Sequence, residues 1–197
     1  MPPTDAPLTR ERILVAAEDV VRRFGPTKAT VLDAARALGV SHTAVYRHIS
    51  TKAELRNLVV GRWAEATMAP LRTIAAESGP AAPRLRRLFD TLVAGKRIRA
   101  RQDPELFAAY RTLAIDAKSA AAAHVDEIVD LAALIIRDGI TDGAFRNVDP
   151  ARAGRAVLVA TFRFHHPAHF AEWDAPTIDS SYEDVWQLLM SGLRERS

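Results

Sequence analysis

Residues 30–55, TVLDAARALGVSHTAVYRHISTKAEL, contain the start signals of three helices within 26 positions. Thr30, Ser41 and Thr51 are residue types that cap helix N-termini by accepting hydrogen bonds from free backbone N–H groups. Gly39 lies between the first two starts, and glycine readily adopts the left-handed conformation that ends a helix in a sharp turn. The stretch therefore predicts three helices separated by two tight connections.

The first two of these helices have the spacing of a helix-turn-helix. Two helices that cross steeply need a small residue at their contact, and Ala35 supplies it. Gly39 follows four residues later, and Val45 comes six residues after that as the apolar residue that the second helix contributes to the shared core. An ordinary helical hairpin with a solvated polar face is the alternative interpretation of this spacing.

The second helix has an outward face of hydrogen-bonding side chains. They are Ser41, His42, Thr43, Tyr46, Arg47 and His48. A recognition helix enters the major groove by its N-terminal end, where short donors and acceptors can reach base edges. Lys52 lies in the first turn of the next helix, where free N–H groups also attract a phosphate. This face therefore favours double-stranded DNA as the partner.

Residues 9–56 resemble the N-terminal domain of the TetR family of bacterial transcriptional regulators. The resemblance is carried by Thr30, Ala35, Gly39, Val40, Ser41, Tyr46, His48, Lys52 and Leu55. The chain departs from the family pattern at Ala34, Ile49 and Thr51, where Ile, Phe and Ser are usual. Leu32 replaces a polar residue that contacts bases in some members, so no DNA contact is assigned to it.

The resemblance implies an all-α fold, with a three-helix helix-turn-helix DNA-binding domain on a larger helical domain that binds a ligand and dimerises. It implies that phosphates are held by Thr30, Tyr46, His48 and Lys52, and that bases are read by His42, Thr43 and Arg47. We expect a tail at 1–8, a DNA-binding domain at 9–55 and a ligand-binding and dimerisation domain at 56–197. The expected function is that of a homodimeric repressor, released from a pseudo-palindromic operator by an unknown small molecule.

Composition agrees with an intracellular DNA-binding protein. The chain has 197 residues, no Cys and a net charge of +3, and that excess lies within residues 1–57. A local positive charge suits a polyanionic partner. No apolar run approaches the roughly 20 residues of a membrane span. We therefore expect an all-α cytoplasmic protein that binds no membrane, and we predict no cofactor and no enzymatic activity.

The C-terminal part shows helical periodicity and two candidate surfaces. Helices are expected at about 84–100, 103–114, 117–138, 150–166 and 180–194. Small residues in 151–166 and apolar residues in 180–194 predict that these two segments form the dimer interface. The aromatic and histidine side chains that could line a ligand cavity are Phe89, Phe107, Tyr110, Phe162 and His166, although residues with this spacing can equally be core.

Two further features allow other interpretations. His165 and His169 are four residues apart, as a metal-binding pair on one helix would be, and an all-α metal-binding protein or metal-dependent enzyme is the alternative function. Pro167 lies between them and would disturb that helix, so no metal site is predicted. Residues 84–101 hold seven Lys or Arg and one acid, Asp90. Such a run could face DNA or an acidic ligand, but a solvated helix face is its commonest explanation.

Overall fold

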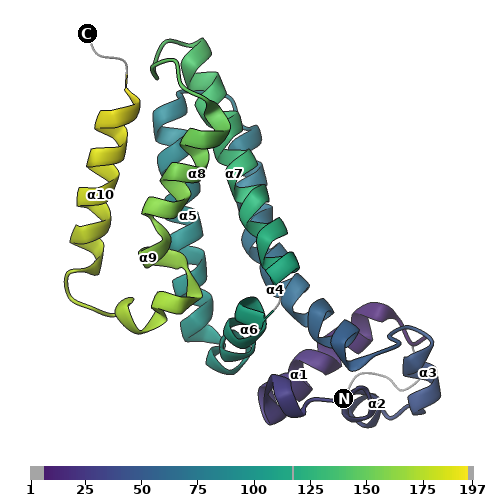
Figure 1. The fold of residues 1–197 in the computed structure, drawn as a ribbon. Helices are drawn as coiled ribbons and strands as arrows, with labels where there is room; N and C mark the ends of the chain where they lie inside the picture. The colour runs from purple at the N-terminus through teal and green to yellow at the C-terminus, as the bar shows by residue number, and fades with distance from the viewer. Residues whose placement is uncertain (1–6, 117, 195–197) are drawn as a thin grey trace. The chain divides into compact units, whose positions relative to one another are not determined.

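The computed structural model describes residues 7–116 and 118–194, so residues 1–6 of the predicted tail lie outside the described part. The regular elements there are all helical, and the only β contact among them is an isolated bridge between Phe145 and Arg194. The prediction of an all-α fold is confirmed. The elements (Figure 1) are α1 Arg10–Lys28, α2 Val31–Leu38, α3 His42–Tyr46, α4 Lys52–Ala76, α5 Ala81–Gln102, α6 Pro104–Asp116, α7 Lys118–Thr141, α8 Pro150–Ala160, α9 Phe162–His165, η1 Pro167–Glu172 and α10 Ile178–Leu193.

The chain forms two compact units. The N-terminal unit comprises residues 1–65 and 100–118, and the C-terminal unit comprises residues 66–99 and 119–197. Helix α6 therefore belongs with the first three helices, although it is distant from them in sequence. None of the described helices is both long and apolar enough to cross a membrane.

Helix α1 buries one apolar stripe in the N-terminal unit. Ile13, Ala17, Val20 and Val21 are buried, as the helical periodicity predicts. Phe24, which lies in register with this stripe, is 52% exposed. The helix is interrupted directly after it by Gly25, whose φ of 75° lies in the left-handed region, so the buried stripe ends at Val21.

Helix α6 packs against α1 at a charged contact and contributes to an aromatic cluster. Arg22 Nε donates to Asp103 Oδ2 at 2.7 Å, and Asp103 Oδ1 accepts from the Leu106 backbone N–H at 3.1 Å. Asp103 thus both caps α6 and fixes it to α1. The ring of Trp63 stacks on Tyr110 with 3.9 Å between centroids.

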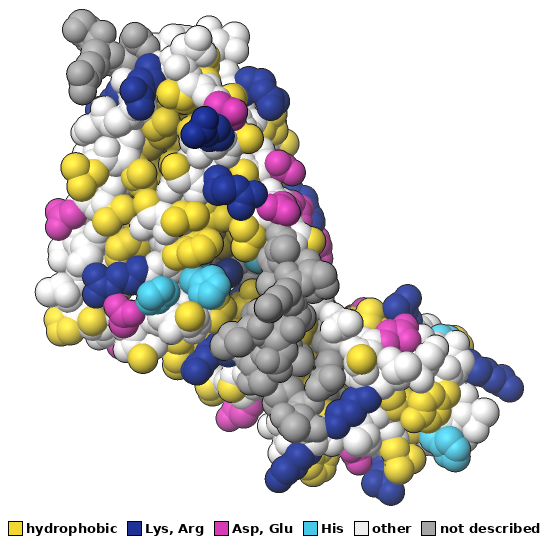
Figure 2. All heavy atoms as spheres, viewed as in Figure 1, with side chains coloured by type: hydrophobic (Ala, Val, Ile, Leu, Met, Phe, Trp, Pro, Cys, Tyr) yellow, Lys and Arg dark blue, Asp and Glu magenta, His cyan; other side chains and the backbone are white. Residues whose placement is uncertain are grey.

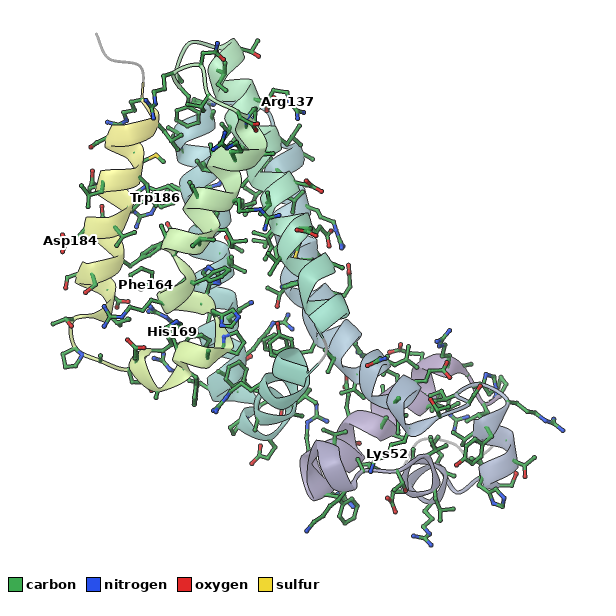
Figure 3. The ribbon with its side chains drawn as sticks, viewed as in Figure 1. Lys52, Arg137, Phe164, His169, Asp184 and Trp186 are labelled. Carbon is green, nitrogen blue, oxygen red and sulfur yellow. The ribbon has the colours of Figure 1, made fainter. Side chains whose placement is uncertain are left out.

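The core of the C-terminal unit is shared by α4, α5, α7, α8 and α10. Phe164 and Trp186 both point into the space between α10 and the helices beside it (Figure 3). Trp186 lies 5.9 Å from the Phe89 ring, and Phe164 lies 5.1 Å from the Tyr182 ring. Phe89 is fully buried here, as a core residue.

The prediction of one continuous helix over 150–166 is wrong. Helix α8 ends at Ala160, and Thr161 has non-helical dihedral angles of φ −96° and ψ 2° before α9 begins. The Thr161 hydroxyl lies 2.9 Å from the Val157 carbonyl oxygen, a bond back to the preceding turn that often bends helices. His165 therefore does not continue the direction of α8.

Gly154, in the middle of α8, permits a close approach to α7. A Cβ at this position would lie 3.0 Å from the Val129 carbonyl oxygen and 3.2 Å from the Ala133 nitrogen. Gly154 is one of the small residues of 151–166 that the sequence predicts to pack between subunits. Its contact is with α7 of the same chain.

The predicted solvated face at 84–101 is wrong at two positions. Arg84 is 5% exposed and Lys96 is 4% exposed. Arg84 donates to the Ala75 carbonyl oxygen at 2.8 Å and to Asp138 Oδ2 at 2.9 Å, so its charge is paired. A run of basic residues is solvated only where its members lie on the outer face of the helix. Arg84 and Lys96 lie on sides of α5 that other parts of the unit cover.

Candidate nucleic-acid interface

The turn between α2 and α3 has the geometry that the sequence predicts. Gly39 adopts φ 66° and ψ 27°, and its N–H donates to the Arg36 carbonyl oxygen at 3.1 Å. The Val40 N–H donates to the Ala35 carbonyl oxygen, also at 3.1 Å. These bonds satisfy carbonyl groups at the end of α2 and fix the direction in which the chain enters α3.

Thr30 closes a capping box at the start of α2. The Asp33 N–H donates to Thr30 Oγ1 at 3.2 Å, the Thr30 N–H donates to Asp33 Oδ2 at 3.2 Å, and the Thr30 hydroxyl donates to the same oxygen at 2.6 Å. Thr30 therefore holds the beginning of α2, with its hydroxyl hydrogen directed to Asp33. Contact between Thr30 and a phosphate stays a prediction.

Helix α3 is anchored by very few buried side chains. Ser41 caps it by accepting from the Ala44 N–H at 3.3 Å. Val45 is fully buried, and so is Ile49 just after the helix. A five-residue helix cannot be stable by itself, so these contacts and the cap hold it in place.

The other side chains of this segment form an exposed polar face. Its members are Ser41, His42, Thr43, Tyr46, Arg47 and His48, and all six are exposed. The rings of His42 and Tyr46 lie one helical turn apart, with 6.4 Å between their centroids in an edge-to-face arrangement. Figure 2 shows histidine, lysine and arginine side chains spread over the surface of the N-terminal unit. The structure thus brings the predicted base-reading residues together on one continuous surface.

The start of α4 lies next to this face in sequence and is strongly capped. The Glu54 N–H donates to Thr51 Oγ1 at 3.0 Å, and Glu54 Oε2 accepts from the Ser50 N–H at 2.8 Å. Lys52, labelled in Figure 3, is half-buried in this first turn. A cation there opposes the helix dipole, which favours anions at an N-terminus, so a bound phosphate would stabilise the arrangement.

The residues predicted to line a ligand cavity lie in both compact units. Phe107 and Tyr110 pack with Trp63 in the N-terminal unit. Phe162 and His166 lie together in the C-terminal unit, with 5.2 Å between their ring centroids. Phe89 belongs to the core of that unit.

The alternative metal pair is not supported by the geometry. His165 is buried at the end of α9, whereas His169 lies in η1 with its Nδ1 2.7 Å from Glu172 Oε1. Helix α9 ends before Pro167, so the two histidines do not share the face of one helix. Across the part of the chain that the structure describes, no group of three or more His, Cys, Asp or Glu is arranged to hold a metal ion.

Sequence reasoning missed a set of buried basic groups in the C-terminal unit. Burial lowers the pKa of Lys96 to about 8. Burial, with the nearby charges of Lys96 and Arg72, lowers the pKa of His124 to about 4. Burial also holds the pKa of His165 well below its usual range. These residues come from three separate helices, so no local spacing could have associated them.

Comparison with known sequences assigns both parts of the chain. Residues 13–59 match the profile described as bacterial regulatory proteins, tetR family. Residues 81–186, more than half of the chain, match the profile described as tetracyclin repressor-like, C-terminal domain. A search of curated protein sequences gave no significant match.

Solved structures share the fold at low sequence identity. SmeT, the repressor of the Stenotrophomonas maltophilia multidrug efflux pump SmeDEF, is 20% identical with a TM-score of 0.72, covering 98% of this chain and 93% of that one. A TetR transcription regulator from Haloarcula marismortui is 19% identical with a TM-score of 0.72, covering 94% and 97%. NalD, the secondary repressor of the Pseudomonas aeruginosa pump MexAB-OprM, is 19% identical with a TM-score of 0.63, covering 95% and 97%.

The two profile matches agree with the helix-turn-helix geometry of α2 and α3 and with the all-helical C-terminal unit. The chain therefore belongs to the TetR family and is a DNA-binding transcriptional regulator.

Proposed function

We propose that this chain is a homodimeric repressor that binds a pseudo-palindromic operator and is released from it by a small molecule. The observation that carries the proposal is the exposed polar face of α3. The helix is held in place by its Ser41 cap and by Val45, its one buried side chain, so most of its surface remains available to a partner. A recognition helix of this kind obtains its contacts in the major groove. The chain thus acts by binding, in the cytoplasm where bacterial DNA lies, and not by catalysis.

Roles on the DNA are divided by the reach and position of each side chain. His42 and Thr43 lie at the N-terminal tip of α3, and Arg47 lies one turn further on. These three side chains contact base edges in the major groove. Tyr46, His48 and Lys52 address phosphates, which fix the register of the protein on the duplex without reading sequence. Ser41 lies at the same tip, where its oxygen also caps the helix.

The dimer is proposed to form through α8 and α10. Leu188 on α10 is 75% exposed and Val159 on α8 is 55% exposed, and both are large apolar side chains. Between these helices lies a groove lined in part by Ala153, Ala156, Leu188 and Leu189. A second copy of the chain related by a two-fold axis would cover this surface with the same surface of its own.

Release by a ligand is proposed from population shift. A compound that fits the C-terminal unit better in the arrangement that does not bind DNA moves the equilibrium toward that arrangement. Helix α4, which runs unbroken from Lys52 to Ala76, contributes residues to both compact units and connects them covalently. Triclosan forms a complex with the related SmeT, which is 19% identical, and supports the expectation of a small organic ligand here.

Selection from a random double-stranded DNA library tests the proposal. A two-fold symmetric dimer is expected to enrich an inverted repeat, with half-sites about one helical turn or more apart. Enrichment of a single unrepeated site would contradict binding as a dimer. Retention of all sequences equally would contradict the sequence-specific function itself.

A further inference from the structure

Three basic side chains from three different helices of the C-terminal unit are buried or partly buried. Lys96 is on α5, His124 is on α7, and His165 ends α9. Lys96 is 4% exposed and His165 is 2% exposed, so both are removed from water almost completely. Figure 2 shows histidine side chains among hydrophobic ones on one face of this unit. The cluster of Lys96, His124 and His165 is called the basic cluster below.

Hydrogen bonding leaves one ring nitrogen of His165 unused. The Thr161 hydroxyl has one hydrogen and lies within bonding distance of the Val157 and Leu158 carbonyl oxygens, at 2.9 and 3.1 Å. Its oxygen is 3.3 Å from His165 Nε2, and the tautomer of the ring decides which of the two atoms donates. His165 Nδ1 is buried, and it has no hydrogen-bond partner among the described residues.

His124 repeats this feature on a different helix. Its Nε2 is also buried, and within the described part of the chain it likewise has no hydrogen-bond partner. Buried polar atoms are nearly always paired, and leaving one unpaired costs about 1–3 kcal/mol. Two such atoms in one interior region point to a molecule that supplies the missing partners.

Electrostatics indicates the charge of that molecule. The charged groups that depress the pKa of His165 beyond the effect of burial are Lys96, His166 and His124, and all three are basic. Lys96 and Arg72 act in the same direction on His124, although Arg72 also donates to Glu127. Because the lowered pKa values leave His124 and His165 neutral at pH 7, the buried positive charge is that of Lys96, and a buried cation favours an anionic partner.

The surroundings of the basic cluster add an aromatic surface. The Phe162 ring meets the His165 ring edge-to-face at 5.7 Å and lies 5.2 Å from the His166 ring. Phe162 itself packs against the hydrophobic core of the unit. An apolar group attached to an anionic one would thus find both kinds of contact close together.

We propose that Lys96, His124 and His165 form the polar end of the ligand site, and that the ligand is an organic acid with an apolar body. This inference rests on the proposed function, because it names the chemical class of the molecule that releases the repressor. The Lys96 ammonium pairs with the carboxylate, and His165, in the tautomer that carries its hydrogen on Nδ1, donates that hydrogen to a carboxylate oxygen. His124 supplies a further bond at the same end.

Matched probes test the charge requirement. Binding of 2-naphthoate and octanoate is measured by isothermal titration calorimetry at pH 7 and compared with 2-naphthamide and octanamide, which have nearly the same shapes without the charge. At least one of the two carboxylates is expected to bind ten times or more tightly than its own amide. If neither carboxylate is preferred over its amide, the proposal is overturned.

Variants locate the site. Lys96→Met is expected to abolish the preference for the carboxylate, and His165→Phe is expected to weaken carboxylate binding. His169→Gln, the control, changes the surface partner of Glu172 and should leave the affinity for the carboxylate and its preference over the amide unchanged. Thermal unfolding of each variant verifies folding, and Lys96→Gln replaces Lys96→Met if the latter does not fold. Full retention of the preference in the folded Lys96 variant would overturn the proposal.

DNA binding by the same preparations separates this inference from the proposed function. A protein that binds its selected operator but shows no preference for either carboxylate keeps the repressor function and loses the anionic site. A protein that prefers the carboxylate but binds no DNA keeps the anionic site, and the repressor function fails.

Discussion

At the scale of single residues, Lys96 occupies a position that opposes folding. Its ammonium group is almost completely buried, and burial lowers its pKa to about 8 from the 10.5 of a free side chain. A lysine contributes more to the stability of a folded protein at the surface, where its charge is hydrated, than in the interior. The position is intelligible if Lys96 binds an anion, since functional groups are often held at the expense of stability.

Replacing Lys96 with Met is expected to stabilise the unliganded protein most below pH 8. Because the folded-state pKa lies below the unfolded one, the unfolded chain holds the lysine proton more tightly. The destabilisation is therefore complete below about pH 8 and disappears as the pH rises toward 10.5. A shift of this size corresponds to about 3 kcal/mol. Urea unfolding at pH 7 and pH 10 measures the difference, which should be larger at pH 7, and a variant less stable than the parent at pH 7 would contradict the prediction.

At the scale of elements, helices α7 and α8 approach closely because Gly154 has no side chain. A Cβ there would meet the backbone of α7, at the Val129 carbonyl and the Ala133 nitrogen, and neither can move aside as a flexible side chain could. Gly61 in α4 offers a contrast, since a Cβ there would meet nothing within 4 Å. The two glycines are helical residues with opposite surroundings.

Substituting each glycine with alanine should therefore have opposite effects. Gly154→Ala is expected to lower the free energy of unfolding by about 1–3 kcal/mol, the range for overpacking a core. Gly61→Ala should raise it by about 0.5–1 kcal/mol, because alanine loses less conformational entropy in a helix. Chemical unfolding monitored by circular dichroism measures both. A stabilising Gly154→Ala would show that α7 and α8 can separate at little cost.

The elements also show what sequence reasoning could reach. The caps at Thr30, Ser41 and Thr51, and the left-handed Gly39, were predictable because each depends on residues three or four positions away. The break at Thr161 was not, because a threonine within a helical pattern carries no local signal of non-helical dihedral angles. The basic cluster was equally out of reach, since Lys96, His124 and His165 are brought together only by the packing of three helices.

At the scale of the whole molecule, the proposed function requires two copies of α3 on one DNA duplex. The polar face of each α3 supplies sequence preference, whereas Lys52 and the other phosphate contacts supply affinity that depends on salt. The face was predictable in its composition, and its exposure follows from the burial of Val45 and Ile49 beneath it. The partition of the chain into compact units was less accessible, because α6 joins the N-terminal unit although residues 66–99 of the other unit intervene in sequence.

The most direct test of this division of roles is the affinity of α3 variants for the selected operator and for a scrambled duplex, measured by fluorescence anisotropy over a range of salt concentrations. The triple variant His42→Ala, Thr43→Ala, Arg47→Ala keeps the buried Val45 and Ile49, and circular dichroism verifies its fold. We predict that it binds both duplexes with nearly equal affinity, while Lys52→Ala weakens both in parallel and reduces the slope of affinity against salt. Undiminished preference of the folded triple variant for the operator would contradict the account.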